Sequence, residues 1–295
     1  MSYFNNKTIW ITGASSGIGE ALAVHLSKLN ANLILTARRK DELERVKNRC
    51  GNSNVHIFPC DLENIDNIDE LSNKVHTQFN QIDILINNAG VSAWSSIKDT
   101  DFDVFEKVMK LNYLSVVKLT QSVLPKMIKR KSGQIVANTS LLGVLAIKNR
   151  GVYASSKHAM HGFMNVLRAE MHEHNIKVNT VAPGLVDTEV GVKALTEDGS
   201  TYGKNDRGHA TKGMSAEDAA NMILNAIRKD KRETYIIPSP STSSPAHTRT
   251  LLSSEPLRTT PPHMHTLRTQ SPCPRSSRSS APVATASSRT TLSSQ

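Results

Sequence analysis

The stretch Thr12-Gly13-Ala14-Ser15-Ser16-Gly17-Ile18-Gly19 stands near the start of the chain and decides its fold. A short β-prone run over 7–12 leads into it, and a helical pattern of apolar residues over 20–30 follows it. Strand, glycine turn and helix in this order are the context of a dinucleotide-binding fingerprint. The sequence therefore predicts an α/β fold with nucleotide binding at its first turn. The alternative is an ordinary glycine turn.

Each glycine of this loop has a predicted role. Gly13 permits the tight turn, Gly17 lets a pyrophosphate approach the backbone, and Gly19 lets helix and strand pack closely. The helix N-terminus then offers free N–H groups and a positive dipole end to the phosphates. The spacing is G-x-x-x-G-x-G instead of the usual G-x-G-x-x-G. The other predicted cofactor-binding residues of the loop are Ser15, Ser16 and Ile18.

Two arginines, Arg38 and Arg39, follow the second predicted strand at 32–37. In dinucleotide folds the end of this strand meets the adenosine ribose. A carboxylate there binds the 2′-hydroxyl of NAD, whereas an arginine suits the 2′-phosphate of NADP. Because guanidinium pairs bidentately with phosphate, the sequence predicts NADP (NADPH) as the cofactor. The alternative is a basic helix start exposed to solvent.

Tyr153 and Lys157 stand four residues apart, which is about one helical turn. A cation beside a phenol favours the phenolate, so such a tyrosine could give or take a proton near neutral pH. The same spacing occurs in many helices as a solvated pair. The other motifs of the chain decide between the two interpretations.

Five motifs stand in order along the chain: TGASSGIG at 12–19, NNAG at 87–90, Ser140, Tyr153-x-x-x-Lys157 and Pro183-Gly184. Together they resemble the single-domain short-chain dehydrogenase/reductase family from about residue 5 to residue 238. The pattern over 194–203 resembles the branch of dehydrogenase/reductase members 7 and 7B and related bacterial oxidoreductases. The resemblance implies an NADP-dependent oxidoreductase that moves a hydride between nicotinamide and a carbonyl or secondary alcohol.

The resemblance also implies catalytic roles. Tyr153 would be the general acid/base, and Lys157 would lower its pKa and bind the nicotinamide ribose. Ser140 would hold the substrate oxygen and stabilise developing negative charge. Asn112 would hold a water that links the lysine to solvent. The structural alternatives are a strand-end hydroxyl bonded to its own backbone for Ser140 and a contact between helices for Asn112.

The remaining predicted cofactor-binding residues rest on the same resemblance, and each has a structural alternative. Asp61 and Leu62 would seat the adenine, although an aspartate there is equally a helix N-cap. A close approach of the ribose is expected at Asn88, Ala89 and Gly90. The turn beside the nicotinamide is expected to comprise Pro183, Gly184, Val186 and Thr188, with Thr188 reaching the carboxamide.

Strands and helices alternate six or seven times within about 240 residues, enough for one core. This predicts a single doubly wound parallel sheet (Rossmann) over 1–238, with strand order 3-2-1-4-5-6-7. Gly13, Asn88 and Ser140 each follow a strand, so the ligand is expected at the carboxyl ends. The family pairs through two long central helices, here expected at about 103–130 and 153–174, which implies a homodimer or homotetramer.

Two further segments are expected to shape the substrate pocket. The weakly periodic region over 186–215 is a candidate lid, and its end predicts a helix N-cap at Ser215. The apolar segment 141–152 is the expected wall, with Lys148 and Arg150 near its rim. This favours a lipophilic ketone, aldehyde or secondary alcohol as the substrate. A small hydroxy amino acid is the alternative, because bacterial relatives act on such molecules.

Cysteine usage and hydropathy predict the location. Cys50, Cys60 and Cys273 have no paired spacing, which predicts no disulfide framework, no metal site and a reducing compartment. No stretch reaches about 18 apolar residues, and the first six residues are too short and polar for a signal peptide. The sequence therefore predicts a cytoplasmic protein without a transmembrane segment.

After Pro238 the composition changes. In 239–295 more than half of the residues are Ser, Thr or Pro, lysine is missing, and six arginines face one acid, Glu255. Such a segment cannot offset its ordering entropy by burial, so a disordered tail is predicted. It is either a solvated appendage or the product of an altered reading frame.

Two functional alternatives follow from this change: a catalytically impaired NADP-binding relative, or an interaction protein using its basic tail. Nucleic acid is the less favoured partner because the tail has no aromatic residue for stacking.

Overall fold

The computed structural model describes residues 3–51, 54–203 and 213–237. The predicted disordered tail from Ser239 onward lies outside these residues, as does the middle of the predicted lid.

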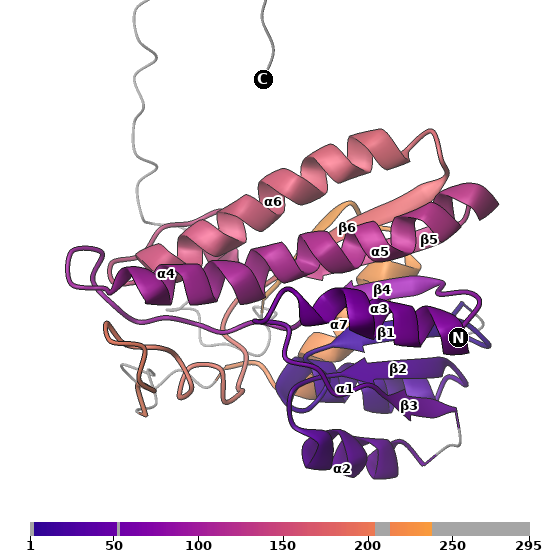
Figure 1. Ribbon diagram of the computed structural model, residues 1–295, viewed down its shortest axis with the longest axis horizontal. Helices are drawn as coiled ribbons and strands as arrows, with labels where there is room; N and C mark the ends of the chain where they lie inside the picture. The colour runs from indigo at the N-terminus through magenta and orange to yellow at the C-terminus, as the bar shows by residue number, and fades with distance from the viewer. Residues whose placement is uncertain (1–2, 52–53, 204–212, 238–295) are drawn as a thin grey trace, which may run out of the picture. The chain divides into compact units, whose positions relative to one another are not determined.

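The described residues form a seven-stranded parallel sheet in the predicted order, β3-β2-β1-β4-β5-β6-β7 (Figure 1). The strands are β1 (Thr8–Thr12), β2 (Asn32–Thr36), β3 (Val55–Ile57), β4 (Ile84–Asn87), β5 (Gly133–Asn138), β6 (Ile176–Pro183) and β7 (Glu233–Ile236). Each pairs in parallel with its neighbours in that order. Because helices cover both faces, central strands such as β1 and β2 consist of continuous apolar runs instead of alternating patterns.

Helices pack on both faces of the sheet. One face carries α1 (Gly17–Ser27), α2 (Lys40–Cys50) and α7 (Ala216–Arg228). The other carries α3 (Asn67–Gln78), α5 (Ser115–Arg130) and α6 (Gly151–Met171). Each face has its own core of buried apolar side chains, and a smaller third cluster includes Ala93, Val152 and Leu195. On β1, Ile9 and Ile11 join the first core and Trp10 the second, as the twofold alternation of a strand requires.

The predicted helix at 103–130 is a continuous helical run of three parts. It begins with α4 (Phe102–Met109), passes through the π-helical segment η1 (Lys110–Leu114) and continues as α5. In Figure 1 this run and α6 lie on the same side of the sheet. The second predicted helix, at 153–174, is observed as α6 over Gly151–Met171.

The strand order reverses between β1 and β4, because β2 and β3 lie on one side of β1 and β4 to β7 on the other. Ligands of doubly wound folds bind beyond the carboxyl ends of the strands at such a switch point. The glycine loop after β1, the NNAG turn after β4 and Ser140 after β5 all stand at this edge. Within the described part of the chain, no helix is long and apolar enough to cross a membrane.

Candidate active site

The glycine loop adopts a backbone that favours glycine. Gly13 and Gly17 have φ angles of +64° and +55°, in the left-handed region. Gly19 begins the packing of α1 onto β1: a Cβ added there would lie 2.2 Å from the carbonyl oxygen of Gly13. A Cβ on Gly13 would lie 2.7 Å from the Cα of Ala89, in the turn after β4. The loop is therefore a backbone cradle with no room for side chains at these points.

The turn after β4 is tied to the glycine loop through Thr12 and Asn88. The Thr12 hydroxyl oxygen accepts hydrogen bonds from the backbone N–H groups of Asn88 and Ala89, each at 3.0 Å. The Asn88 side-chain amide donates to the carbonyls of Thr12 and Gly13 at 3.0 and 3.2 Å. Asn138 at the end of β5 donates to Asn88 Oδ1 at 2.7 Å. The Asn88 side chain thus links three strand ends.

Ser140, Tyr153 and Lys157 come together beyond the carboxyl end of β5. Ser140 is the N-cap of the short 3₁₀ turn η2 (Leu141–Gly143), and its Oγ accepts the Leu142 N–H at 3.1 Å. The same hydroxyl acts on the Tyr153 phenol as a hydrogen-bonding group that lowers the Tyr153 pKa. The Lys157 Nζ lies 5.6 Å from the Tyr153 ring centroid and donates to the Asn138 carbonyl at 3.2 Å. The backbone bond that was the structural alternative for Ser140 is therefore present, and it leaves the hydroxyl next to the tyrosine.

Burial dominates the electrostatics of this group. It raises the pKa of Tyr153 above its ordinary value, against the lowering effects of the Ser140 hydrogen bond and the Arg150 charge. It also lowers the pKa of Lys157 to about 8. The predicted effect of Lys157 on the Tyr153 pKa is not seen among these causes and stays a prediction. The Lys157 ammonium is held by the Asn138 carbonyl, and Arg150 is the cation whose charge lowers the Tyr153 pKa.

Asn112 is buried in the π-helical segment η1. Its amide donates to the Val91 carbonyl at 2.9 Å and to Ser156 Oγ at 3.0 Å, and its Oδ1 accepts the Val91 N–H at 2.8 Å. A Cβ added to Gly90 would lie 3.1 Å from Asn112 Oδ1 and 3.5 Å from Lys157 Nζ, so the predicted residues of this corner are neighbours. Single-turn π segments inside α-helices occur frequently at functional sites. The extra residue places Asn112 against the turn after β4.

A cavity of about 360 Å³ opens beside the glycine loop. Its walls are Ser16, Gly17, Glu20, Arg39, Glu42, Arg45, Asp187, Thr188, Glu189 and Lys193. A Cβ on Gly17 would lie 3.0 Å from the Thr188 methyl group, so Thr188 covers the loop from the lid side. Arg38 and Arg39 are both exposed, and of the two only Arg39 is among the walls of this cavity. A glycine cradle next to a polar cavity with an arginine on its wall fits the phosphates of a dinucleotide.

Arg45, for which no role was predicted from the sequence, links α2 to the glycine loop and to the start of α1. Its guanidinium makes a bidentate pair with Glu20 at 2.7 and 2.8 Å and donates to the Ser15 carbonyl at 3.2 Å. Arg49 also pairs with Glu20. The Glu20 pKa is lowered, chiefly by the hydrogen bond from Arg45. A Glu on the first turn of a helix with arginines on the next helix is the only sequence signal for this network.

The other predicted cofactor-binding residues have mainly structural contacts here. Ile18 packs against the first core, and Leu62 is buried in the second. Asp61 Oδ1 accepts the Glu63 N–H at 3.1 Å, which is a local turn contact and not the helix N-cap that was the alternative. α3 begins later, with Asp66 at its N-cap position.

The segment after β6 is tied to β7 and to the lid. Pro183 pairs with Ile236, and the Gly184 N–H bonds the Ile236 carbonyl at 2.9 Å. Val186 is bridged to Met214, which brings the two described ends of the lid together. Ser215 caps α7 as predicted, accepting the Asp218 N–H at 3.0 Å.

From the sequence, Arg150 is expected at the rim of the pocket, and no role is predicted for Trp94 or Tyr202. In the structure the Arg150 guanidinium lies over the Trp94 ring, 3.9 Å from its centroid, and the Trp94 and Tyr202 rings are 6.0 Å apart. The sequence signals for this contact are weak: Trp94 follows the NNAG turn, and Tyr202 lies in the predicted lid.

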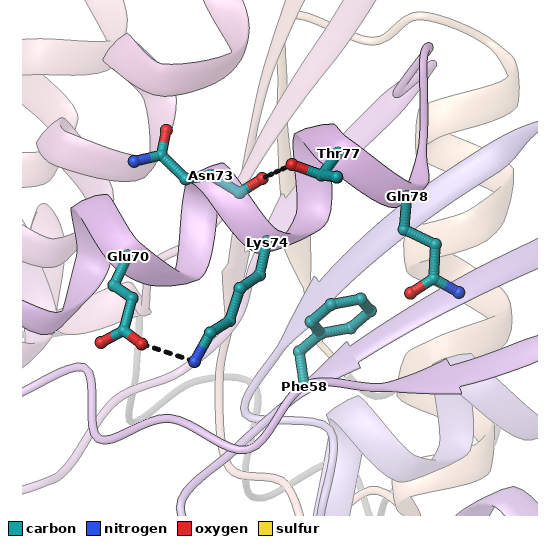
Figure 2. A pocket seen from close by; sticks show the side chains of 6 residues that line it. All are labelled: Phe58, Glu70, Asn73, Lys74, Thr77 and Gln78. Atoms are coloured by element: carbon teal, nitrogen blue, oxygen red, sulfur yellow. Dashed lines mark hydrogen bonds and ion pairs between the residues drawn. The ribbon is translucent and has the colours of Figure 1, made fainter.

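A second hollow, of about 520 Å³, lies between α3 and Phe58, at the far edge of the sheet (Figure 2). Its walls are Phe58, Glu70, Asn73, Lys74, Thr77 and Gln78, with a Glu70–Lys74 ion pair of 2.6 Å across its side. None of the predicted site residues lines it.

Comparison with known proteins identifies sequence relatives and structures of the same fold. Residues 7–198 match the short chain dehydrogenase family. The chain is 41% identical over 244 residues to human dehydrogenase/reductase SDR family member 7, covering 80% of this chain and 71% of that protein. It is 42% identical over 236 residues to the SDR family protein 7-like of Drosophila melanogaster, covering 78% and 72%. L-sorbose reductase from Gluconobacter frateurii, solved with NADPH and L-sorbose, has a TM-score of 0.70 at 26% identity, covering 80% and 97%.

Proposed function

This chain belongs to the short-chain dehydrogenase/reductase family, and we propose that it is an NADP-dependent oxidoreductase acting on a carbonyl or secondary alcohol. Membership of the family supports oxidoreductase activity. The observation that carries the finer proposal is the Ser140–Tyr153–Lys157 group at the same sheet edge as the glycine cradle.

The site residues have the chemistry that carbonyl reduction needs. The Ser140 hydroxyl would hold the carbonyl oxygen, and the Tyr153 phenol would give it a proton. NADPH, when bound, supplies the hydride that the carbonyl carbon receives. The product is an alcohol, and Tyr153 is left as a phenolate that recovers its proton through the buried Lys157 and Asn112 corner. Oxidation is the reverse: the phenolate takes the alcohol proton.

The preference for NADP rests on Arg39. Its guanidinium stands on the wall of the cavity beside Ser16 and Gly17, the place that an adenosine 2′-phosphate would reach from the glycine loop. The NADPH bound by the sorbose reductase structure belongs to that protein and supports the same cofactor here. Arg38, being exposed beside it, would add positive charge without a fixed contact.

The substrate class is proposed from the wall over 141–152. Val144, Leu145 and Ile147 are 41%, 38% and 54% exposed next to the η2 turn that carries Ser140. Exposed apolar side chains beside a catalytic group favour a lipophilic ketone, aldehyde or secondary alcohol. A panel that includes small hydroxy amino acids separates this class from the alternative.

A Tyr153→Phe variant tests the mechanism. With NADPH and a panel of aldehydes and ketones, the full-length protein is expected to oxidise NADPH, and the variant to lose at least about 100-fold in turnover because the proton donor is missing. NADPH binding by the variant is the control and should change little. Equal turnover by both proteins would refute the assignment of Tyr153. Binding of NADPH without turnover on any substrate would favour the catalytically impaired relative.

Two further properties are part of the proposal. A homodimer or homotetramer would pair the helices α5 and α6. Leu114, at the end of η1 just before α5, is 41% exposed, and Val166 on α6 is 58% exposed. A monomer in light scattering would count against this oligomeric state.

A cytoplasmic location is consistent with the free thiols of Cys50 and Cys60, and fractionation of cells tests this location directly.

A further inference from the structure

Arg150 stands immediately before the helix that carries the catalytic group. It occupies the N-cap position of α6, and its guanidinium carbon lies 3.9 Å from the centroid of the Trp94 ring. Its Nη1 donates to Ser92 Oγ at 3.0 Å and to the Ala93 carbonyl at 3.1 Å. Stacking on an indole together with two hydrogen bonds fixes a side chain that on a surface would sample many rotamers.

Three segments of the chain meet at this guanidinium. The backbone N–H of Trp94 donates to the Leu195 carbonyl at 2.8 Å, and that of Ser95 donates to the Asn149 carbonyl at 3.0 Å. The Tyr202 ring centroid lies 6.0 Å from that of Trp94, and the Tyr202 backbone N–H donates to the Ala194 carbonyl at 2.7 Å. The turn after β4, the start of α6 and the described part of the lid thus hold the Arg150 charge in one place.

That place is one helical turn before Tyr153. The Arg150 carbonyl accepts the Ala154 N–H at 2.8 Å, so the first turn of α6 begins at Arg150. Ala93, whose carbonyl accepts the Arg150 Nη1, belongs to the apolar cluster against which Tyr153 packs. The Arg150 charge lowers the pKa of Tyr153, and Tyr153 and Tyr202 in turn favour the charged guanidinium. Burial lowers the pKa of Arg150 to about 10, which still leaves it charged at neutral pH. The other groups that face Tyr153 are the Ser140 hydroxyl from η2 and Lys157 from α6 itself.

We infer that Arg150 is a positioning residue for proton transfer: clamped on Trp94, it holds a positive charge beside Tyr153 and stabilises the phenolate. The inference rests on the proposed role of Tyr153. In reduction the Tyr153 O–H bond breaks and its proton goes to the carbonyl oxygen, while the carbon accepts the hydride. In oxidation the phenolate takes the alcohol proton, and the hydride leaves the carbon for NADP⁺. In reduction a fixed cation makes the phenol a stronger acid, and in oxidation it raises the fraction of phenolate present at neutral pH.

Variants at this position separate charge from packing. Arg150→Met keeps an apolar stem for Trp94 and removes the charge, and Arg150→Gln removes the charge but keeps a donor for Ser92 and Ala93. Arg150→Lys restores a positive charge without the planar fork. The matched control is Lys148→Met, which removes an exposed cation two residues away. Circular dichroism checks that each variant is folded. Because there are two neutral variants, the test can still be made if one of them does not fold.

The first readout needs no substrate. Full-length protein carrying fluorotyrosine is titrated by fluorine NMR, and the Tyr153 resonance is identified by its loss in Tyr153→Phe. The titration midpoint of Tyr153 should move to higher pH in both neutral variants and return toward that of the wild type in Arg150→Lys. Lys148→Met should leave it in place. An unmoved midpoint in the folded neutral variants would overturn the inference.

The second readout is the pH profile of kcat/KM for alcohol oxidation. The rising limb should move to higher pH in the neutral variants, and each pH unit that it moves should cost on the order of tenfold in kcat/KM at neutral pH. A uniform loss at all pH values would mean that Arg150 only packs, and would overturn the inference. A wild-type protein without turnover would refute the proposed function instead, while the NMR titration would still decide on Arg150.

Discussion

The hydroxyl oxygen of Thr12, at the end of β1, lies 3.0 Å from the backbone nitrogen of Asn88, in the turn after β4. A second bond of the same length joins it to the Ala89 nitrogen. One side chain thus accepts two consecutive N–H groups across the switch point of the sheet. This contact fixes the distance between the glycine cradle and the turn that borders Lys157 and Asn112.

Thr12→Val should therefore destabilise the protein more than its small change in shape suggests. Two backbone N–H groups would lose their acceptor, which costs on the order of 2–4 kcal/mol together. Urea unfolding of the full-length protein measures this cost. Thr8→Val is the matched control on the same strand, since no hydrogen bond of its hydroxyl is found within the described residues. Similar midpoints for the two variants would contradict the role of Thr12.

Gly19→Ala should abolish NADPH binding and lower stability. The new Cβ would lie 2.2 Å from the Gly13 carbonyl oxygen, so the cradle must open. Gly162→Ala is the control: this glycine is exposed on α6, and an added Cβ meets nothing within 4 Å. That variant is expected to gain about 0.5–1 kcal/mol from helix propensity. If Gly19→Ala binds NADPH like the wild type, the loop does not hold the pyrophosphate.

Arg39→Gln should weaken NADPH binding and leave NADH binding nearly unchanged. A hydrogen bond to a charged group contributes about 1.5–3 kcal/mol, which corresponds to at least about a tenfold loss in affinity. Lys40→Gln removes an exposed neighbouring charge and serves as the control. An equal loss for both cofactors would assign Arg39 to the pyrophosphate instead of the 2′-phosphate. A full effect from Arg38→Gln alone would move the specificity to that residue.

Glu20 should make stability depend on pH. Its pKa is lowered in the folded state, first by the Arg45 hydrogen bond, so its carboxylate stabilises the fold above the unfolded pKa of about 4.3. This contribution disappears as the pH falls through the lower folded value. Glu20→Gln is expected to be less stable than the wild type at pH 7 and to approach it in acid. Asp41→Asn, an exposed carboxylate nearby, should show no such convergence.

Short-range patterns predicted the fold well. The strand–glycine–helix unit at 12–19 and the alternation of strands and helices led to the sheet order that is observed. Chain order also predicted that Gly13, Asn88 and Ser140 would lie at one edge of the sheet, because parallel strands bring their carboxyl ends together. The meeting of Ser140 with Tyr153 and Lys157 was expected from the family resemblance. The N-cap at Ser215 followed from local hydrogen-bonding chemistry alone.

Long-range packing was not predictable. Arg150 lies over Trp94, which the lid residue Tyr202 contacts, and no local pattern encodes this meeting of three segments. The effect of Lys157 on the Tyr153 pKa stays a prediction; burial, which raises that pKa here, is a property of the whole fold that short patterns do not encode. The Asn88 side chain, predicted for the cofactor, is engaged in holding strand ends together.

The most direct test is a titration of the purified full-length protein with NADPH, with NADH as comparator. Energy transfer from the tryptophans, of which Trp94 lies beside the site, to bound nicotinamide reports binding. The structure predicts saturable transfer with NADPH and much weaker binding of NADH. Saturation by neither cofactor would contradict the proposal that this chain is an NADP-dependent oxidoreductase.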